Sequence, residues 1–565
     1  MEEERRNLIM FFVISVLIMA ASPYFFGNGG EESVSRSSVA VTGGPKPGLS
    51  SGVPAAKAEV PVRHTEVKNI RIETGNLSGV ISSRGVKIDN VFLKKYKKDS
   101  NGEERVRVLG DNGSFACTGW SSEDPNVILP DENSCWETSS ETLSENSPAI
   151  FTWDNGNGLL FEKHVSVDEN YLITVVDRVK NYGADTVALK SLSIVRREFP
   201  AADGAVTFYE GPMGCVNGKT EEIPYEDIAK KHVICRKTQG GWFGITDKYW
   251  LTAFIPNRKL NYEMVCRQIS EDGKNICRME SITDFMTVAP SMEISGTHRL
   301  FAGAKEIHTL DMYEKKLQVD HFDLAIDFGW LYILTKPLLY ALAYTKDLVG
   351  NMGLGILLLT LLLKLLLLPL ANKSYRSMGR MSAVQPKIQE LRKKYAGDNA
   401  ALGQAISEIY KKEQINPLGG CLPLLLQSPI LFALYKVLYI SIEMRQAYFL
   451  WWIRDLSQPD PATVLNLCGL IPINLPGFLQ VGIWPLLMGI SMLLQQKMNP
   501  TPTADPAQEK MLLIMPIMFT FMFAQLPSGL VIYWTFSNIF GILQQYWIQK
   551  SDERSRSKAK AQKSR

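Results

Sequence analysis

The chain has 565 residues, of which 45% are hydrophobic and 21% are charged, and its formal net charge at pH 7 is +3. This length predicts more than one structural unit. The nearly balanced charge singles out no class of partner, and six histidines in the whole chain leave little material for a metal site. The average composition hides two unlike parts, because residues 27–320 are polar and residues 328–548 are almost entirely apolar.

The N-terminal segment is a short charged stretch, with Arg5 and Arg6, followed by an apolar run at residues 8–26. The length of this run favours a retained transmembrane anchor at residues 1–26 with its amino end inside the cell. A cleaved signal peptide is the alternative, because small residues follow Met19 at a position where a peptidase could cut. Residues 27–59 are rich in Gly, Ser, Pro and Ala and predict a flexible linker.

Residues 60–320 contain recurrent short runs rich in β-branched residues, for example residues 172–177 and 187–195. Asn-Gly pairs such as Asn217-Gly218 separate several runs and favour tight hairpin turns. Strands at this spacing predict an all-β sandwich domain. No pair of carboxylates and no histidine cluster in it has a spacing that compels catalysis.

The predicted β domain holds six of the eight cysteines, namely Cys117, Cys135, Cys215, Cys235, Cys266 and Cys277. An even set after a membrane anchor is compatible with disulfides in an oxidising compartment, and we assume pairing between neighbours along the chain. Scattered reduced thiols are the alternative. Four tryptophans could line a carbohydrate cleft, although packing is the more frequent role of such side chains; they are Trp120, Trp136, Trp153 and Trp242.

An aromatic-rich, amphipathic segment at residues 321–350 precedes the apolar half of the chain. It predicts a helix that lies in the outer interface of a membrane. Packing against the β domain is an alternative that does not exclude the first.

Five further apolar runs are close to the length that spans a bilayer; they are residues 354–370, 419–442, 478–495, 511–526 and 530–548. Together with the anchor they predict six transmembrane helices, with both chain ends in the cytoplasm and the β domain outside. Every strongly basic loop then falls on the cytoplasmic side, as the positive-inside rule requires.

Residues 372–415 contain nine basic and four acidic residues, which indicates a cytoplasmic loop. Apolar residues at helical spacing predict two antiparallel amphipathic helices, with Asp398 capping the second. A solvated hairpin is one reading, and contact with substrate or targeting machinery is the other. The candidate contacts are Arg376, Arg380, Lys387, Arg392, Lys393 and Lys394. The basic tail at residues 549–565 suits ribosomal RNA or anionic lipid, or serves topology alone.

Lys364 lies among twelve leucines in the run 354–370. At the bilayer centre a lysine costs about 2.5 to 3.5 kcal/mol, which the leucines more than offset. No Asp or Glu occurs within the apolar runs, so water near Lys364 is expected. Snorkelling is the alternative, since the polar end of the helix is about 9 Å away. Further polar residues should face the bundle interior or water; the candidates are Thr360, Gln427, Ser428, Gln495 and Thr520.

Four stretches of this chain resemble the YidC-type membrane protein insertases of bacteria; they are the lysine-bearing span ending in Pro369-Leu370, residues 391–395, the run Asn416-Pro417-Leu418-Gly419-Gly420-Cys421, and residues 526–530. The resemblance implies a six-helix bundle with a large periplasmic β-supersandwich domain in the inner membrane, and no enzyme activity or cofactor. It also implies a hydrated, positively charged groove for nascent membrane proteins, with the ribosome, the Sec translocon and the lipid bilayer as partners.

By the same resemblance, Tyr533 and Trp534 lie along the substrate path, although interfacial anchoring explains such aromatic residues almost as well. One departure concerns the intramembrane cation, which is usually arginine in this family and is Lys364 here. Lysine keeps the charge but loses the planar fork that grips carboxylates.

Two other classes of function remain open at this stage. A secondary transporter with a solute-capturing β domain is the first, but its usual internal repeats are not evident between the spans. An envelope enzyme that acts on sugars is the second, and it would need paired carboxylates near an aromatic cleft.

Overall fold

The computed structural model describes residues 67–99, 102–200, 209–395, 398–413, 422–464, 480–498 and 506–563. These residues form two compact units, one that ends at Trp330 and one that begins at Leu331. The predicted anchor at residues 1–26 and the linker at residues 27–59 lie outside the described residues.

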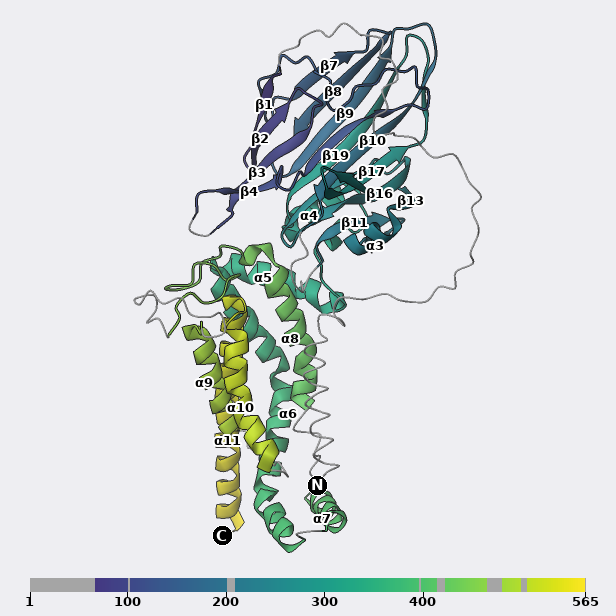
Figure 1. Cartoon of the computed structure of the whole chain (residues 1–565). Coiled ribbons are helices and arrows are strands. Elements are labelled where there is room, and N and C mark those ends of the chain that lie inside the picture. Colours follow the sequence, from purple (N-terminus) through teal and green to yellow (C-terminus); the bar gives the residue numbers. More distant parts are fainter. Residues whose placement is uncertain are drawn as a thin grey trace. The chain divides into compact units, whose positions relative to one another are not determined.

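The first unit is built on two large sheets (Figure 1). One has the strand order β13 (Val233–Gln239), β16 (Asn261–Glu271), β17 (Lys274–Thr283), β10 (Val187–Glu198), β5 (Phe115–Ser121), β3 (Ile88–Lys97), β2 (Leu77–Ser82), β1 (Asn69–Glu73) and β6 (Thr142–Leu143), with β18 (Met286–Val288) beside β10 and β4 (Arg105–Leu109) beside β3. The other has the order β12 (Lys219–Glu222), β11 (Gly211–Val216), β14 (Trp242–Thr246), β15 (Trp250–Ile255), β19 (Glu293–Ala304), β9 (Leu172–Asn181), β8 (Leu159–Val167) and β7 (Ala149–Asp154). Short helices α3 (Tyr225–Lys231), α4 (Ile307–Leu317) and η1 (Phe322–Ala325) complete the unit.

The predicted all-β domain is confirmed, and its local signals act as expected. Asn217 and Gly218 both have positive φ, 50° and 75°, as a tight hairpin turn between β11 and β12 requires. Along β8 every second side chain is buried, which is the pattern of a strand with one face on the core.

Buried polar side chains connect the two sheets. Lys163 on β8 pairs with Asp177 on the adjacent β9 at 2.8 Å, and its Nζ also donates to Thr118 on β5 of the other sheet, at 2.7 Å to the backbone oxygen. His298 on β19 is 2.8 Å from the hydroxyl of Ser191 on β10. These side chains are less than a tenth exposed, so each depends on the others for its hydrogen bonds.

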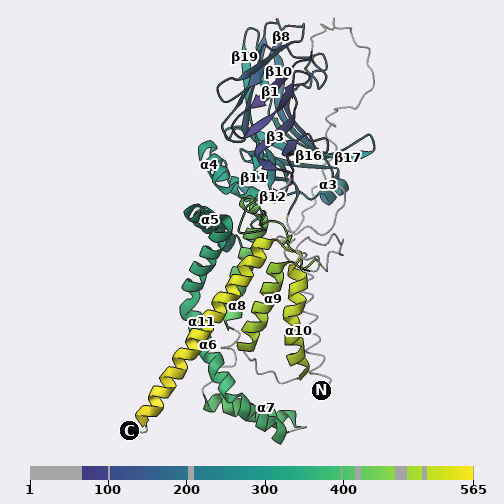
Figure 2. The same cartoon turned by 90° about the vertical axis from the view of Figure 1, so that its left-hand side faces the viewer.

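The second unit is helical and consists of α5 (Tyr332–Val349), α6 (Met352–Lys394), α7 (Asn399–Lys412), α8 (Leu422–Ile440), η3 (Ile442–Met444), α9 (Ile483–Met498), α10 (Pro506–Phe523) and α11 (Ser528–Lys563). Figures 1 and 2 show α6, α8, α9, α10 and α11 running alongside one another, with α7 turned aside after α6. The amphipathic helix expected at 321–350 is α5, which starts at Tyr332, because residues 322–325 form η1 of the first unit.

Helix α6 is longer than the sequence suggested. It runs without a break for 43 residues, through Pro369 and Pro386, so the first helix of the predicted hairpin is the second half of α6 rather than a separate element. Each proline lacks a backbone N–H and crowds the carbonyl four residues before it, and α6 nevertheless continues past both. The second hairpin helix is α7, and Asp398 caps it as predicted by accepting from the backbone N–H of Ala401 at 3.0 Å.

One helix among the described residues is long and apolar enough to cross a membrane. It is the Met352–Pro369 part of α6, with a mean hydropathy of 2.3. Ser428–Ile440 and Ile514–Phe523 are shorter apolar helices. The number of transmembrane helices therefore stays a prediction.

The inter-sheet network predicts a pH dependence of stability. Burial lowers the pKa of His298 from 6.5 to about 4, against the partial opposition of Asp177. The unfolded chain protonates His298 more readily than the folded one. The contribution of neutral His298 to the free energy of unfolding is therefore complete above pH 6.5, and about 3 kcal/mol of it is lost as pH falls from 6.5 towards 4. Urea unfolding of wild type and His298→Gln at several pH values should show this extra loss in wild type only. The matched control His308→Gln removes an exposed histidine and should keep the wild-type slope.

Candidate functional site

The face of α6 that carries Lys364 consists of residues at four-residue spacing, and their exposure increases along the helix. Ile356 and Thr360, on this face, are each 2% exposed. Lys364 is half-buried, and Leu368 is 37% exposed. Packing against the other helices therefore loosens near Lys364, one turn beyond Thr360.

The neighbouring helices show the same gradient. On α11, residues 528–533 are all buried, whereas only Gln545 and Ile548 are buried among residues 542–550, and the buried residues of α9 all lie between Trp484 and Ser491. The direction is reversed on α8 and α10, where burial is greatest near the end of each helix, as at Val437 and Ala524. The bundle is thus tightly packed at the end where α6, α9 and α11 begin, and more open further along these helices, on α6 from about Leu361 onward.

The predicted hydroxyl residues lie in the packed region and not in an open groove. Thr360 Oγ1 donates to the carbonyl of Ile356 at 2.7 Å, and Thr520 Oγ1 on α10 donates to the carbonyl of Pro516 at 2.8 Å. Both threonines are buried. Bonding to the preceding turn satisfies these hydroxyls without water, so the groove role that the sequence suggested for them is not visible in this conformation.

Polar side chains from different helices meet near the middle of α6 and of α11 and in the second half of α9. Gln544 donates to Asn372 Oδ1 at 3.0 Å, which joins α11 to α6, and Gln545 donates to the carbonyl of Met498 at 2.7 Å. Gln495, one of the predicted residues, is half-buried on α9 and lies against Gly541. The sequence analysis missed Asn372, Gln544 and Gln545, although amides near the end of an apolar run were a usable signal.

The remaining predicted groove residues differ in position. Tyr533 is 5% exposed, and Trp534 packs edge-to-face on Phe523 of α10 with ring centroids 4.8 Å apart. In this conformation Tyr533 offers almost no surface to a substrate. Ser428 is half-buried at the start of the described part of α8, and the side chain of Gln427 lies outside the described residues.

The cationic residues of the 372–415 hairpin are partly exposed. Lys387 pairs with Glu413 at 2.8 Å, and this contact holds the pKa of Glu413 below its usual value. Arg376, Lys393 and Lys394 are exposed. An apolar seam joins the two helices through Val384, Ile388, Ile406, Ile409 and Tyr410. The side chains of Arg380 and Arg392 lie outside the described residues.

The six cysteines of the first unit are free thiols in place of the predicted disulfides. One neighbour pair is nevertheless close, because Cys266 on β16 and Cys277 on β17 have their Sγ atoms 3.9 Å apart. Both are fully buried. A hydrogen bond with Cys266, together with burial, raises the pKa of Cys277 well above its usual value, and burial raises the pKa of Cys117 and of Cys215 to about 11.

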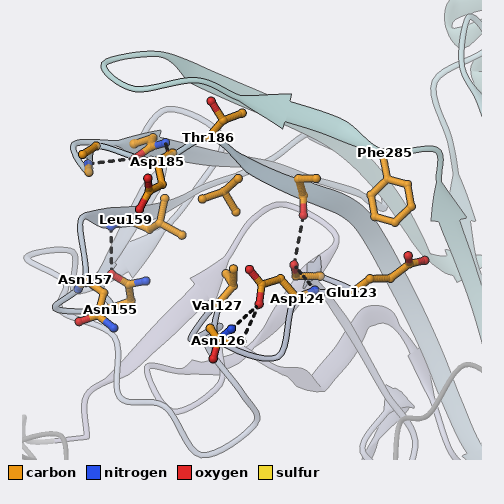
Figure 3. A pocket seen from close by; sticks show the side chains of 16 residues that line it. Glu123, Asp124, Asn126, Val127, Asn155, Asn157, Leu159, Asp185, Thr186 and Phe285 are labelled. Atoms are coloured by element: carbon orange, nitrogen blue, oxygen red, sulfur yellow. Dashed lines mark hydrogen bonds between the residues drawn. The ribbon is translucent and has the colours of Figure 1, made fainter.

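An open polar cavity of about 570 Å³ lies in the first unit (Figure 3). Its walls include Glu123, Asp124, Asp185 and Phe285. Glu123 is paired with Lys190, and Asp124 accepts from the backbone and side chain of Asn126, so two of the three carboxylates serve local structure. The four tryptophans do not line it; Trp120, Trp136 and Trp242 are buried and Trp153 is half-buried, as packing predicts.

Comparison with known proteins supplies the family context of this geometry. The family model described as 60Kd inner membrane protein matches residues 344–556, and the one described as YidC periplasmic domain matches residues 69–341. The chain is 42% identical over 509 residues to the membrane protein insertase YidC of Rickettsia massiliae, which covers 89% of this chain and 91% of the relative. It is 43% identical over 491 residues to the protein of that name from Rickettsia felis, with 86% and 88% covered. A crystal structure of an active YidC insertase matches with a TM-score of 0.38 and 18% identity, covering 86% of this chain and 93% of that one.

The thiol geometry gives a prediction about oxidation. We expect Cys266 and Cys277 to form a disulfide when the first unit folds in an oxidising compartment, because their sulfur atoms already touch. Alkylation of the denatured chain without reductant, followed by mass spectrometry, should find these two residues protected and Cys117 and Cys215 modified. Loss of the bond in a Cys266→Ser/Cys277→Ser variant should lower stability by about 2 to 4 kcal/mol. Recovery of both residues as alkylated thiols would contradict the prediction.

Proposed function

The chain belongs to the YidC family of membrane protein insertases, and from this premise we propose that it inserts membrane proteins along the open half of its helical unit, with Lys364 as the attracting charge. It is an inner-membrane protein with a periplasmic domain, it works on membrane proteins within the lipid bilayer, and it is not an enzyme. The observation that carries the proposal is the loss of packing at Lys364 on the α6 face from Ile356 to Leu368.

The proposed topology has six transmembrane helices and cytoplasmic chain ends. The packed end, where α6, α9 and α11 begin, then faces the periplasm, and the open halves face the cytoplasm. In this orientation the basic hairpin of α6 and α7 and the basic end of α11 lie on the cytoplasmic side, which agrees with the positive-inside rule.

The energetic benefit of such a surface is a shorter path through hydrocarbon. A polar segment that has to cross the full core of about 30 Å loses its hydration throughout. Polar side chains in the open half, among them Gln495 and Gln544, admit water that keeps the segment hydrated over part of this distance. The apolar part of the substrate meanwhile leaves sideways along exposed leucines such as Leu362 and Leu366, which are 49% and 73% exposed.

The role of Lys364 is electrostatic. Among the described residues no carboxylate forms an ion pair with it, so its charge is available to an acidic stretch of a substrate. A diffuse positive field requires only charge, which lysine supplies as well as arginine, whereas a bidentate grip on carboxylates would require arginine. We therefore assign Lys364 the first role.

Two further partners belong to the proposal. Helix α11 has 36 residues, about 54 Å, which is longer than a span requires, so its last turns extend into the cytoplasm. Lys550 and Arg554 are exposed there and suit ribosomal RNA or anionic lipid. Cooperation with the Sec translocon is part of the proposal because of the family resemblance alone.

The charge of Lys364 can be tested in cells depleted of the native protein and supplied with variants. For a small membrane protein with an acidic external segment, Lys364→Ala should slow insertion roughly tenfold, because the attraction to the acidic stretch is lost. Lys364→Arg should restore the rate. Insertion is measured by protease accessibility of the external segment, with equal expression of each variant verified.

The matched control is Lys346→Ala, which removes an exposed lysine of α5 outside the proposed groove and should leave insertion unchanged. If Lys364→Ala inserts the acidic substrate at the wild-type rate, Lys364 merely snorkels. The mechanism would then rest on the neutral polar groups alone.

A further inference from the structure

One loop, residues 441–464, contacts the starts of three helices. It follows α8, contains η3, and buries Met444, Phe449, Ile453 and Leu456 almost completely. The backbone N–H groups in the first turn of a helix have no partner within that helix. The 441–464 loop supplies acceptors to the starts of α9 and α11 and is bound by the residue that caps α6.

Asp460 makes the contact with α9. Its carboxylate accepts from the backbone N–H of Trp484 at 2.8 Å, in the first turn of α9. It also accepts from the indole N–H of Trp452 at 2.8 Å and from the backbone N–H of Ala462 at 3.0 Å, both in the loop itself. Asp460 is 4% exposed, so its charge is balanced by these three donors and by the positive end of the helix dipole.

The start of α11 is held by loop carbonyls. Ser528 and Gly529 donate their backbone N–H groups to Gln458 at 2.7 Å and to Leu456 at 3.0 Å. A Cβ at Gly529 would collide with the side chain of Met444. This close approach favours glycine at position 529 of the 526–530 motif, which the mechanism at Lys364 does not use.

The start of α6 is joined to the same loop through Asn351. Its Oδ1 caps α6 by accepting from the backbone N–H of Leu354, while its Nδ2 donates to the carbonyls of Tyr448 at 3.1 Å and Phe449 at 3.3 Å. The ring of Phe449 fills the space beside Gly353. The loop thus links α6, α9 and α11 at the end where all three are most deeply buried.

We propose that Asp460 is a positioning residue that keeps the 441–464 loop seated on the starts of α6, α9 and α11, and that the seated loop is the barrier to ions at the outer end of the insertase. The orientation of this end rests on the proposed function. A groove that admits water from the cytoplasm needs such a barrier, because otherwise the membrane would leak. The 441–464 loop provides such a barrier, because it gives hydrogen-bond partners to N–H groups at the helix starts and its own interior is filled by apolar side chains.

The test uses the full-length chain reconstituted in liposomes that contain a trapped pH indicator, with no substrate present. Asp460→Ala leaves three donors without their acceptor and should increase the proton leak roughly tenfold or more under an imposed potential. Trp452→Phe removes one donor and keeps the ring, so it should leak less than Asp460→Ala but more than wild type. The matched control is Arg454→Gln, which changes an exposed side chain of the same loop and should stay as tight as wild type.

A second readout separates positioning from general damage. Hydrogen exchange at the starts of α9 and α11 should accelerate together in Asp460→Ala, although Asp460 contacts only α9, while the second half of α11 keeps its protection. A folded Asp460→Ala protein that is as tight as Arg454→Gln would overturn the proposal. If Asp460→Ala does not fold, wild-type tightness of Trp452→Phe would do the same. Because leak is measured without substrate, failure of the Lys364 mechanism would leave this result standing.

Discussion

The helical unit depends on one constraint, which is that the backbone N–H groups at the helix starts need acceptors. Water supplies them at most protein surfaces, but the starts of α6, α9 and α11 are packed together and buried. Asn351, Asp460 and the carbonyls of residues 456 and 458 replace water there. This arrangement allows dense packing at one end of the bundle and places no such demand on the other, towards which exposure rises along α6, α9 and α11.

The increase in exposure along α6 explains why a lysine can be accommodated at position 364. A lysine one turn earlier on the same face, at position 360, would be enclosed by neighbouring helices, and its charge would have neither water nor partner. At position 364 it is half-buried, beyond the tightly packed part. The hydroxyls of Thr360 and Thr520 differ from it because they bond to their own helices and make no demand on solvent. The cation is therefore the group for which the open half matters most.

In the β domain, buried polar side chains also need hydrogen-bond partners, and other side chains supply them. Lys163, Asp177 and His298 lie between two sheets, where an unpaired polar atom is costly, and they are retained because each has partners on the opposite sheet or the adjacent strand. Removing one member of such a network would leave a buried polar or charged partner uncompensated. It also brings a pH-sensitive group into the centre of the domain.

Much of the architecture could be predicted from the sequence because it depends on local patterns. Short runs rich in β-branched residues and the Asn217-Gly218 turn predicted the β domain, and helical spacing with Asp398 predicted α7. The uninterrupted passage of α6 through Pro369 and Pro386 was not predicted, because whether a proline ends a helix depends on the contacts beyond it. The start of α5 was placed too early because residues 322–325 pack on the β domain as η1.

The sequence alone determined the class of protein, the lysine within a leucine-rich run and the basic loops, since these follow from composition and order. The tertiary structure decided which polar residues of the runs are already satisfied, that Cys266 and Cys277 are within reach of one another, and that Asp460 joins a loop to a helix 24 residues away. The physical reason is that hydrogen-bond partners and burial belong to pairs of residues distant in the chain. No local pattern encodes the identity of such a partner.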